Sequence, residues 1–174
     1  MSSDVILTVA QLLAQVEEAA AATSAVIEKC SEEEWETVVA DEERTVGVVL
    51  HHIAYAFPFV VEWVSQLAWG EGAPAVTYDD VHAINHQHAA AQANVAPAAT
   101  LALLQTNAST AQRQLGQLTD ADLQISAHFP LIGGNPISVQ QMVQWFLVNH
   151  VHNHIAAIYQ TIGGKQLDHD GQIR

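Results

Sequence analysis

The last apolar segment of the chain reads Trp145-Phe146-Leu147-Val148-Asn149-His150-Val151-His152-Asn153-His154-Ile155-Ala156-Ala157-Ile158. Its apolar residues recur at the three- and four-residue spacing of a helix with one buried face. A helix turns about 100° per residue, so His150 and His154 lie on the same side of it. His152 points about 200° away from each of them. Two imidazoles on one buried face can bind a metal ion from one side, so the segment predicts part of a metal site.

Helical periodicity extends through most of the chain and predicts an all-α four-helix bundle. The final helix follows a capping box of Ser138 and Gln141 and ends at Gly163-Gly164. The earlier helices are expected from a cap at Ser3-Asp4 to Lys29, from Val46 to Trp69 after a Thr45 cap, from Thr77–Asp80 to Val95, and from Pro97 to Leu118.

The remaining segments are short. Ser31-Glu32-Glu33-Glu34 is a capping-box pattern that opens one helical turn, and the acidic run from Glu32 to Glu43 is interpreted as solvated. Leu123–Phe129 has strand-like alternation but is too short to build a sheet, and Gly133-Gly134-Asn135-Pro136 indicates a turn. We expect one domain over residues 1–174, with residues 165–174 as a loose tail.

Composition excludes several classes of partner. The formal charge is −14, the pI is near 4.8, and there are only five lysines and arginines, which argues against nucleic acid or an anionic membrane. Thr45–Val61 has no formally charged residue, but its histidines and Pro58 favour a buried bundle helix over a membrane span. Without a basic N-terminal start no signal peptide is expected, so we predict a cytoplasmic protein. Cys30 is the only cysteine and is interpreted as a half-buried helix-end residue.

The chain has ten histidines, and their placement carries more information than their number. In the second helix His52 falls on the apolar stripe, whereas His51 lies about 100° off it. Burying three imidazoles without partners would leave several polar atoms unsatisfied, which favours a metal site over a purely structural core. His82 and His86 have polar neighbours and are expected to be exposed; the position of His88 is left open.

Two of the histidine-bearing segments resemble the DinB-like superfamily. Arg44-Thr45-Val46-Gly47-Val48-Val49-Leu50-His51-His52-Ile53-Ala54 is similar to the start of the second helix in that superfamily, with its Thr/Ser cap and its histidine before Leu or Ile. Leu147–Ile155 resembles the HxxxH motif of its last helix. Asp80, Asn85, His88 and Ala89 are similar to a pattern of some members.

The resemblance implies an up-down-down-up bundle with three histidines around a divalent metal, commonly nickel or zinc. Carried over residue by residue, the ligands are His52, His150 and His154, and a small change of helix phase would exchange His51 for His52. The superfamily includes transferases and isomerases that use small thiols. A thiol S-transferase acting on a small electrophile is therefore the leading expectation, and a metal-dependent hydrolase or a non-catalytic metal-binding or ligand-binding protein is the alternative.

Three imidazoles leave a coordination position open, as in catalytic metal sites. Polar candidates near this position are Asn85, Asn149, Asn153 and Glu62, and aromatic candidates for the pocket wall are Tyr55, Trp63 and Trp145. No catalytic acid or base is assigned. A hydrophobic content of 49% is compatible with a homodimer formed through outward helix faces.

Overall fold

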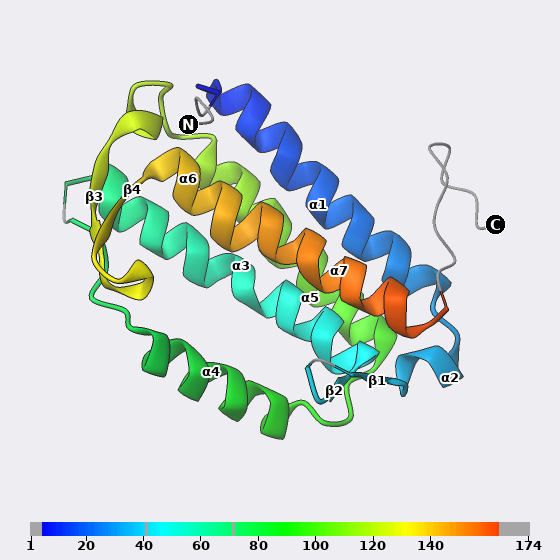
Figure 1. Ribbon diagram of the computed structural model, residues 1–174. Helices are drawn as coiled ribbons and strands as arrows, with labels where there is room; N and C mark the ends of the chain where they lie inside the picture. The colour runs from blue at the N-terminus through cyan, green and yellow to red at the C-terminus, as the bar shows by residue number, and fades with distance from the viewer. Residues whose placement is uncertain (1–4, 41, 71, 164–174) are drawn as a thin grey trace.

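The bundle is built from four long helical segments. The computed structural model describes residues 5–40, 42–70 and 72–163. Its long segments are α1 (Val9–Lys29), α3 (Val46–Ala68), α5 (Pro97–Leu115) and a last one made of α6 (Val139–Val143), η3 (Gln144–Asn149) and α7 (His150–Thr161). α1 and the last segment run in one direction, and α3 and α5 run in the other (Figure 1). The predicted all-α up-down-down-up bundle is therefore confirmed.

Short elements connect the long helices. They are α2 (Glu32–Trp35), β1 (Val38–Val39), β2 (Arg44–Thr45), α4 (Tyr78–Ala91), η1 (Asp122–Gln124), β3 (Ser126–Phe129), η2 (Pro130–Ile132) and β4 (Asn135–Ser138). Because α3 and α5 are parallel, the chain has to travel back along the bundle between them. α4 makes this return outside the bundle, on the side of α3 (Figure 1).

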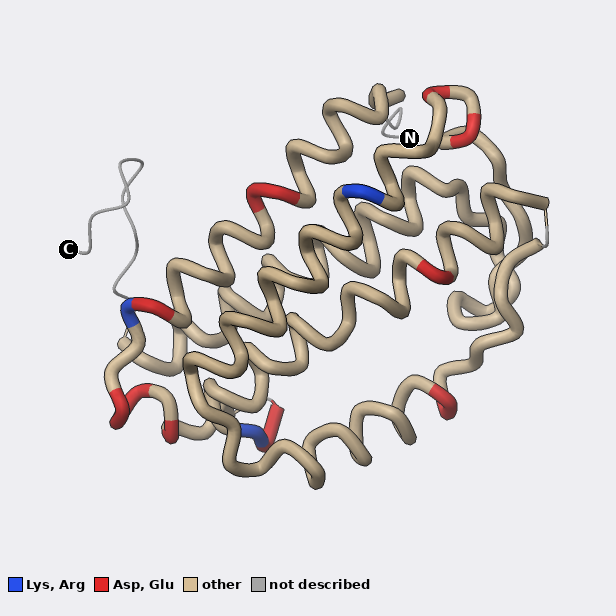
Figure 2. The backbone as a smooth tube through the Cα atoms, turned by 180° about the vertical axis from the view of Figure 1, so that it is seen from behind, with Lys and Arg blue, Asp and Glu red and all other residues tan. Residues whose placement is uncertain are grey.

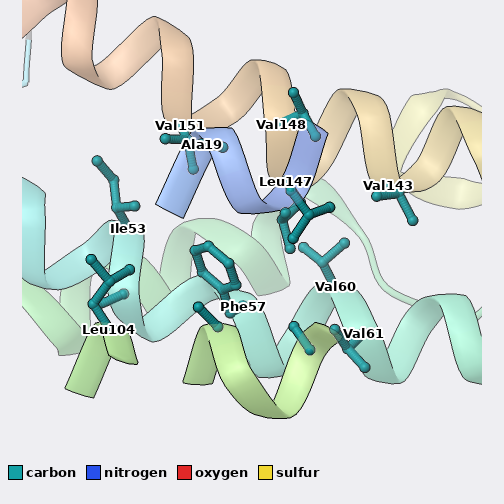
Figure 3. Close-up of a cluster of buried hydrophobic side chains, with 14 of the residues drawn as sticks. Ala19, Ile53, Phe57, Val60, Val61, Leu104, Val143, Leu147, Val148 and Val151 are labelled. Carbon is teal, nitrogen blue, oxygen red and sulfur yellow. The ribbon is translucent and has the colours of Figure 1, made fainter. Parts of the chain in front are cut away.

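The core lies between the four long segments. Ile53 and Phe57 of α3 point toward Leu104 of α5 and toward Leu147 and Val151 of the last segment (Figure 3). Each of these side chains is at most 2% exposed. Burying one side chain of this size stabilises the fold by about 1.5–3 kcal/mol. α3 is long and apolar enough to cross a membrane, but most of that length is buried inside the bundle, so its prediction as a bundle helix is confirmed.

α3 continues through Pro58 with the help of a neighbouring helix. Proline has no N–H to donate to the carbonyl of Ala54, four residues earlier. The side-chain amide of Asn107 in α5 donates to that carbonyl instead, at 2.9 Å. A buried carbonyl without a partner would cost about 1–3 kcal/mol, so this bond links α5 to the middle of α3.

Several predicted boundaries differ from the structure. α1 begins at Val9 after a Thr8–Gln11 capping box, not after Ser3-Asp4, which lie outside the described residues. Residues 5–7 lie outside any helix, and the buried side chain of Gln140 holds them by accepting from Leu7 N and donating to Val5 O. The third and fourth helical segments also end earlier than predicted, at Ala91 and Leu115. The predicted tail at 165–174 lies outside the described residues.

A two-stranded hairpin forms where the sequence predicted no sheet. β3 pairs antiparallel with β4, and the predicted turn at Gly133-Gly134 joins them with positive φ angles of 71° and 76°. The prediction was wrong because Asn135–Ser138 contains Pro136 and shows no strand alternation. The hairpin ends at Ser138, which caps α6 through the predicted capping box with Gln141.

The last segment is not a regular α-helix throughout. Residues Gln144–Asn149 form a π-helix directly before His150. Such wide turns are rare and are often found at functional sites. Val148 near the end of this π-helix is buried, as are Val151 and Ile155 in the α7 turns that carry the histidines.

Candidate metal centre

Three histidines converge between α3 and α7. His52 comes from α3, and His150 and His154 lie one turn apart on α7. The ring centroid of His52 is 5.1 Å from that of His150 and 5.3 Å from that of His154, and the latter two are 4.4 Å apart. Each ring offers one nitrogen, and the three nitrogens lie within 4.8 Å of one another. These three residues are called the histidine cluster below.

The donor atoms of the histidine cluster fit a metal ion. His52 Nδ1 and His150 Nε2 are buried and have no hydrogen-bond partner among the described residues. Ligands about 2.1 Å from a tetrahedral ion are about 3.4 Å apart, so the 4.8 Å separation needs small ring rotations to close around an ion. Three converging imidazole nitrogens are a common ligand set for divalent ions, so the cluster could hold a divalent metal.

Burial keeps two of these imidazoles neutral. Desolvation, followed by the effect of His150 and His154, lowers the pKa of His52 to about 2. Desolvation and the neighbouring His154 lower the pKa of His150 to about 3. Metal ions bind the neutral ring, so at neutral pH these ligands do not have to lose a proton first.

Glu42 connects the histidine cluster to the loop before α3. Its carboxylate accepts from His154 Nδ1 and is also paired with Arg44. Burial would raise the pKa of Glu42, but the hydrogen bond and charge of His154 and the charge of Arg44 outweigh it and lower that pKa. A carboxylate on one ring nitrogen directs the other nitrogen toward a metal and increases its basicity.

The role of Glu42 was missed in the sequence. The acidic run was interpreted as solvated, which holds for Glu32, Glu33 and Glu36 but not for Glu42, whose side chain is 12% exposed. Glu42 and His154 are 112 residues apart, so no local pattern links them.

His51 belongs to a second pair beside the histidine cluster. His51 Nδ1 is 2.8 Å from His88 Nε2, and the His88 ring stacks on Tyr55 at 4.7 Å. Desolvation and then His51 lower the pKa of His88 to about 4. His88 is buried on α4, so α4 supplies the partner that holds His51 on the α4 side of α3. His51 therefore does not replace His52 in the cluster.

Other predicted residues divide between the site and the surface. His82, His86 and His152 are exposed, as predicted. Glu62 is also exposed and accepts a bond from Gln66, so its suggested position near the metal is wrong. Asn149 and Trp145 are exposed and line neither of the two cavities beside the cluster.

An apolar cavity of about 320 Å³ opens onto one side of the histidine cluster. His52 and His150 form part of its wall, together with the predicted candidates Tyr55, Trp63 and Asn85. Further wall residues come from α3, α4, η2 and η3: Phe59, Ile84, Leu131 and Phe146. This space is called the apolar cavity.

A second cavity of about 650 Å³, lined mostly by polar and charged residues, lies on the side of His154. Glu42, Arg44 and Asn153 line it, and Asn85 lines both cavities. Among the described residues, lysine and arginine are spread over three elements, with Lys29 on α1, Arg44 on β2 and Arg113 on α5 (Figure 2). The histidine cluster therefore borders two cavities, one lined mostly by apolar residues and the other mostly by polar residues.

Cys30 takes no part in the site. It caps the C-terminus of α1 and is half-buried, as predicted. Desolvation and the nearby charge of Glu34 raise the pKa of its thiol to about 11, so it remains protonated at neutral pH.

Comparisons with known proteins agree with this architecture. A family model described as the DinB superfamily matches residues 15–158. The solved structure of YfiT from Bacillus subtilis, described as a probable metal-dependent hydrolase with an unusual four-helix bundle topology, is 22% identical, with a TM-score of 0.70 over 88% of this chain and 85% of that one. A comparison with curated proteins found no significant match.

Proposed function

Since the chain belongs to the DinB superfamily, we propose that it is a metal-dependent enzyme in which His52, His150 and His154 bind one divalent ion, nickel or zinc. The observation that carries the proposal is the convergence of three ring nitrogens, one from each histidine, within 4.8 Å of one another. Three imidazoles that leave a coordination position open are a ligand set of catalytic metal sites.

The residues around the ion would have separate roles. A bound divalent ion would lower the pKa of a thiol or of water, so that the nucleophile is an anion at neutral pH. Glu42 would hold the His154 ring in place through Nδ1. The apolar cavity would exclude water on the side of His52 and His150. Asn85 would orient the substrate from the boundary of the two cavities.

We propose transfer of a small thiol to an electrophile as the reaction. The two cavities support this choice, because a transferase has to place two substrates beside one ion. Metal-dependent hydrolysis is the second candidate, since YfiT, which is similar in fold, is described as a probable hydrolase of this kind.

The first test is metal binding and thiol addition in tag-free protein loaded with cobalt. A thiol that enters the open position should produce a sulfur-to-metal charge-transfer absorption. His52→Ala, His150→Ala and His154→Ala should each abolish this band and lower the metal content. His152→Ala and His51→Ala should keep the metal, because these side chains are outside the cluster. Full metal content in all three cluster variants would contradict the proposal.

The second test is turnover with a model electrophile and with a model ester. Thiol consumption that follows the same variant pattern supports the transferase. Ester hydrolysis with that pattern, without thiol consumption, supports the hydrolase. A charge-transfer band without turnover of either substrate would indicate that the protein binds a metal but does not catalyse these reactions.

A further inference from the structure

We infer that the substrate held beside the metal is a small amphiphile, with an apolar alkyl or aryl body in the apolar cavity and an anionic head group directed at the histidine cluster. The inference rests on the proposed metal site and adds the chemical class of the ligand. It is drawn from the shape, lining and position of the apolar cavity.

The lining of the apolar cavity selects an uncharged body. No lysine, arginine, aspartate or glutamate in the described part of the chain lines it. Trp63 is edge-on to Phe146, with ring centroids 5.8 Å apart, and Tyr55 is edge-on to Phe59 at 5.0 Å. These rings are half-buried, so a ligand that covers them removes apolar surface from water.

The volume of the apolar cavity limits the size of the body. An apolar cavity of about 150 Å³ is enough to bind benzene, and ligand pockets generally start near 300 Å³. At about 320 Å³ the cavity can hold one ring with a short chain, or an alkyl chain of similar bulk. A long peptide or a sugar-rich group would have to extend into solvent.

The head group is defined by the two cluster histidines in the wall of the apolar cavity, His52 and His150. Three neutral imidazoles would leave a bound divalent ion with its full positive charge, which favours an anionic ligand. Asn85 makes no side-chain hydrogen bond to any described residue, and it borders both cavities. Its amide is therefore free to bond a polar atom next to the head group.

The proposal predicts how affinity depends on chain length. With the cobalt protein, dissociation constants for ethanethiol, 1-propanethiol, 1-butanethiol and 1-hexanethiol are measured from the charge-transfer band. Each methylene that enters the apolar cavity should lower the constant about fourfold until the cavity is filled.

Variants locate the effect in the apolar cavity. Ala56→Trp fills the cavity from α3, so 1-hexanethiol should lose its advantage while ethanethiol still binds. Ile84→Thr is the milder change on α4 and should weaken the longer thiols selectively. Ala83→Trp on α4 is the control for the added indole ring, because Ala83 is exposed and does not line the cavity.

A metal-free arm separates this inference from the proposed function. Toluene has no head group, and its binding to chelator-treated protein, followed by NMR, should be saturable and lost in Ala56→Trp. Equal affinity along the thiol series, or no toluene binding, would overturn the inference even if the metal site is present. Toluene binding without any thiol charge-transfer band would support ligand binding in the apolar cavity but contradict the proposed thiol transfer.

Discussion

Glu42 is the residue that ties the loop before α3 to the histidine cluster, because its carboxylate accepts from His154 Nδ1. We expect Glu42→Gln to weaken metal binding about 10- to 100-fold, as losses of carboxylate partners of metal ligands generally do. Competition with a chromogenic chelator measures the affinity. Glu43→Gln is the matched control, because the neighbouring Glu43 is exposed. Equal affinities for the two variants would show that Glu42 does not support the site.

At the scale of elements, Asn107 replaces the backbone bond that Pro58 removes from α3. Asn107→Ala should lower the free energy of unfolding by about 1–3 kcal/mol, because the Ala54 carbonyl loses its partner. The loss should be smaller in the Pro58→Ala background, where residue 58 regains an N–H. Urea unfolding of the two single variants and the double variant measures this coupling, and additive losses would contradict it.

The start of α3 depends on a close approach between Gly47 and Trp35. A Cβ atom at residue 47 would lie 2.3 Å from Trp35 Nε1. Trp35 is buried and donates through that nitrogen to Val95 O, which leads into α5. Gly47→Ala should therefore destabilise the protein by about 1–3 kcal/mol through overpacking.

Thermal melts of Gly47→Ala with Trp35 present and absent check this explanation. In a Trp35→Ala background the clash is removed, and alanine should then be no worse than glycine at residue 47. An equal loss in both backgrounds would assign the effect to something other than Trp35.

At the scale of the whole molecule, the buried histidines make the metal-free fold sensitive to acid. The pKa values of His52, His150 and His88 are lowered from 6.5 to about 2, 3 and 4, so below pH 6.5 the unfolded chain binds protons that the folded one does not. Stability is highest above pH 6.5 and should fall by up to about 1.4 kcal/mol per pH unit for each histidine.

Urea unfolding of chelator-treated protein between pH 7 and pH 5 tests this dependence. The range stays above the pKa of Glu42, which is lowered from 4.5, so its pairing with His154 and Arg44 does not contribute. His88→Gln should make the decline shallower, because one buried imidazole is gone. A stability that does not change over this range would contradict the neutral, buried state of the three rings.

Local patterns in the sequence determine much of this protein. Helical periodicity and the caps at Thr45 and Ser138 predict two of the bundle helices, and the cap at Thr77 predicts α4. The four-residue spacing of His150 and His154 places both on one side of α7. These features depend on residues within one or two turns of each other, and backbone geometry alone relates them. The proposed nickel or zinc, the homodimer and the cytoplasmic location stay predictions.

Other features were decided only by tertiary structure, because periodicity shows which side of a helix is buried but not which element covers it. α4 lies beside α3, so His88 pairs with His51, and this leaves His52 to the histidine cluster. The loop before α3 brings Glu42 to His154 across 112 residues. The hairpin and the π-helix were also not predicted, because no local pattern marks β4 or the π-helix. Leu131, between the two strands, and Phe146 of the π-helix line the apolar cavity together with α3 and α4, so only the packing of these separate elements forms that cavity.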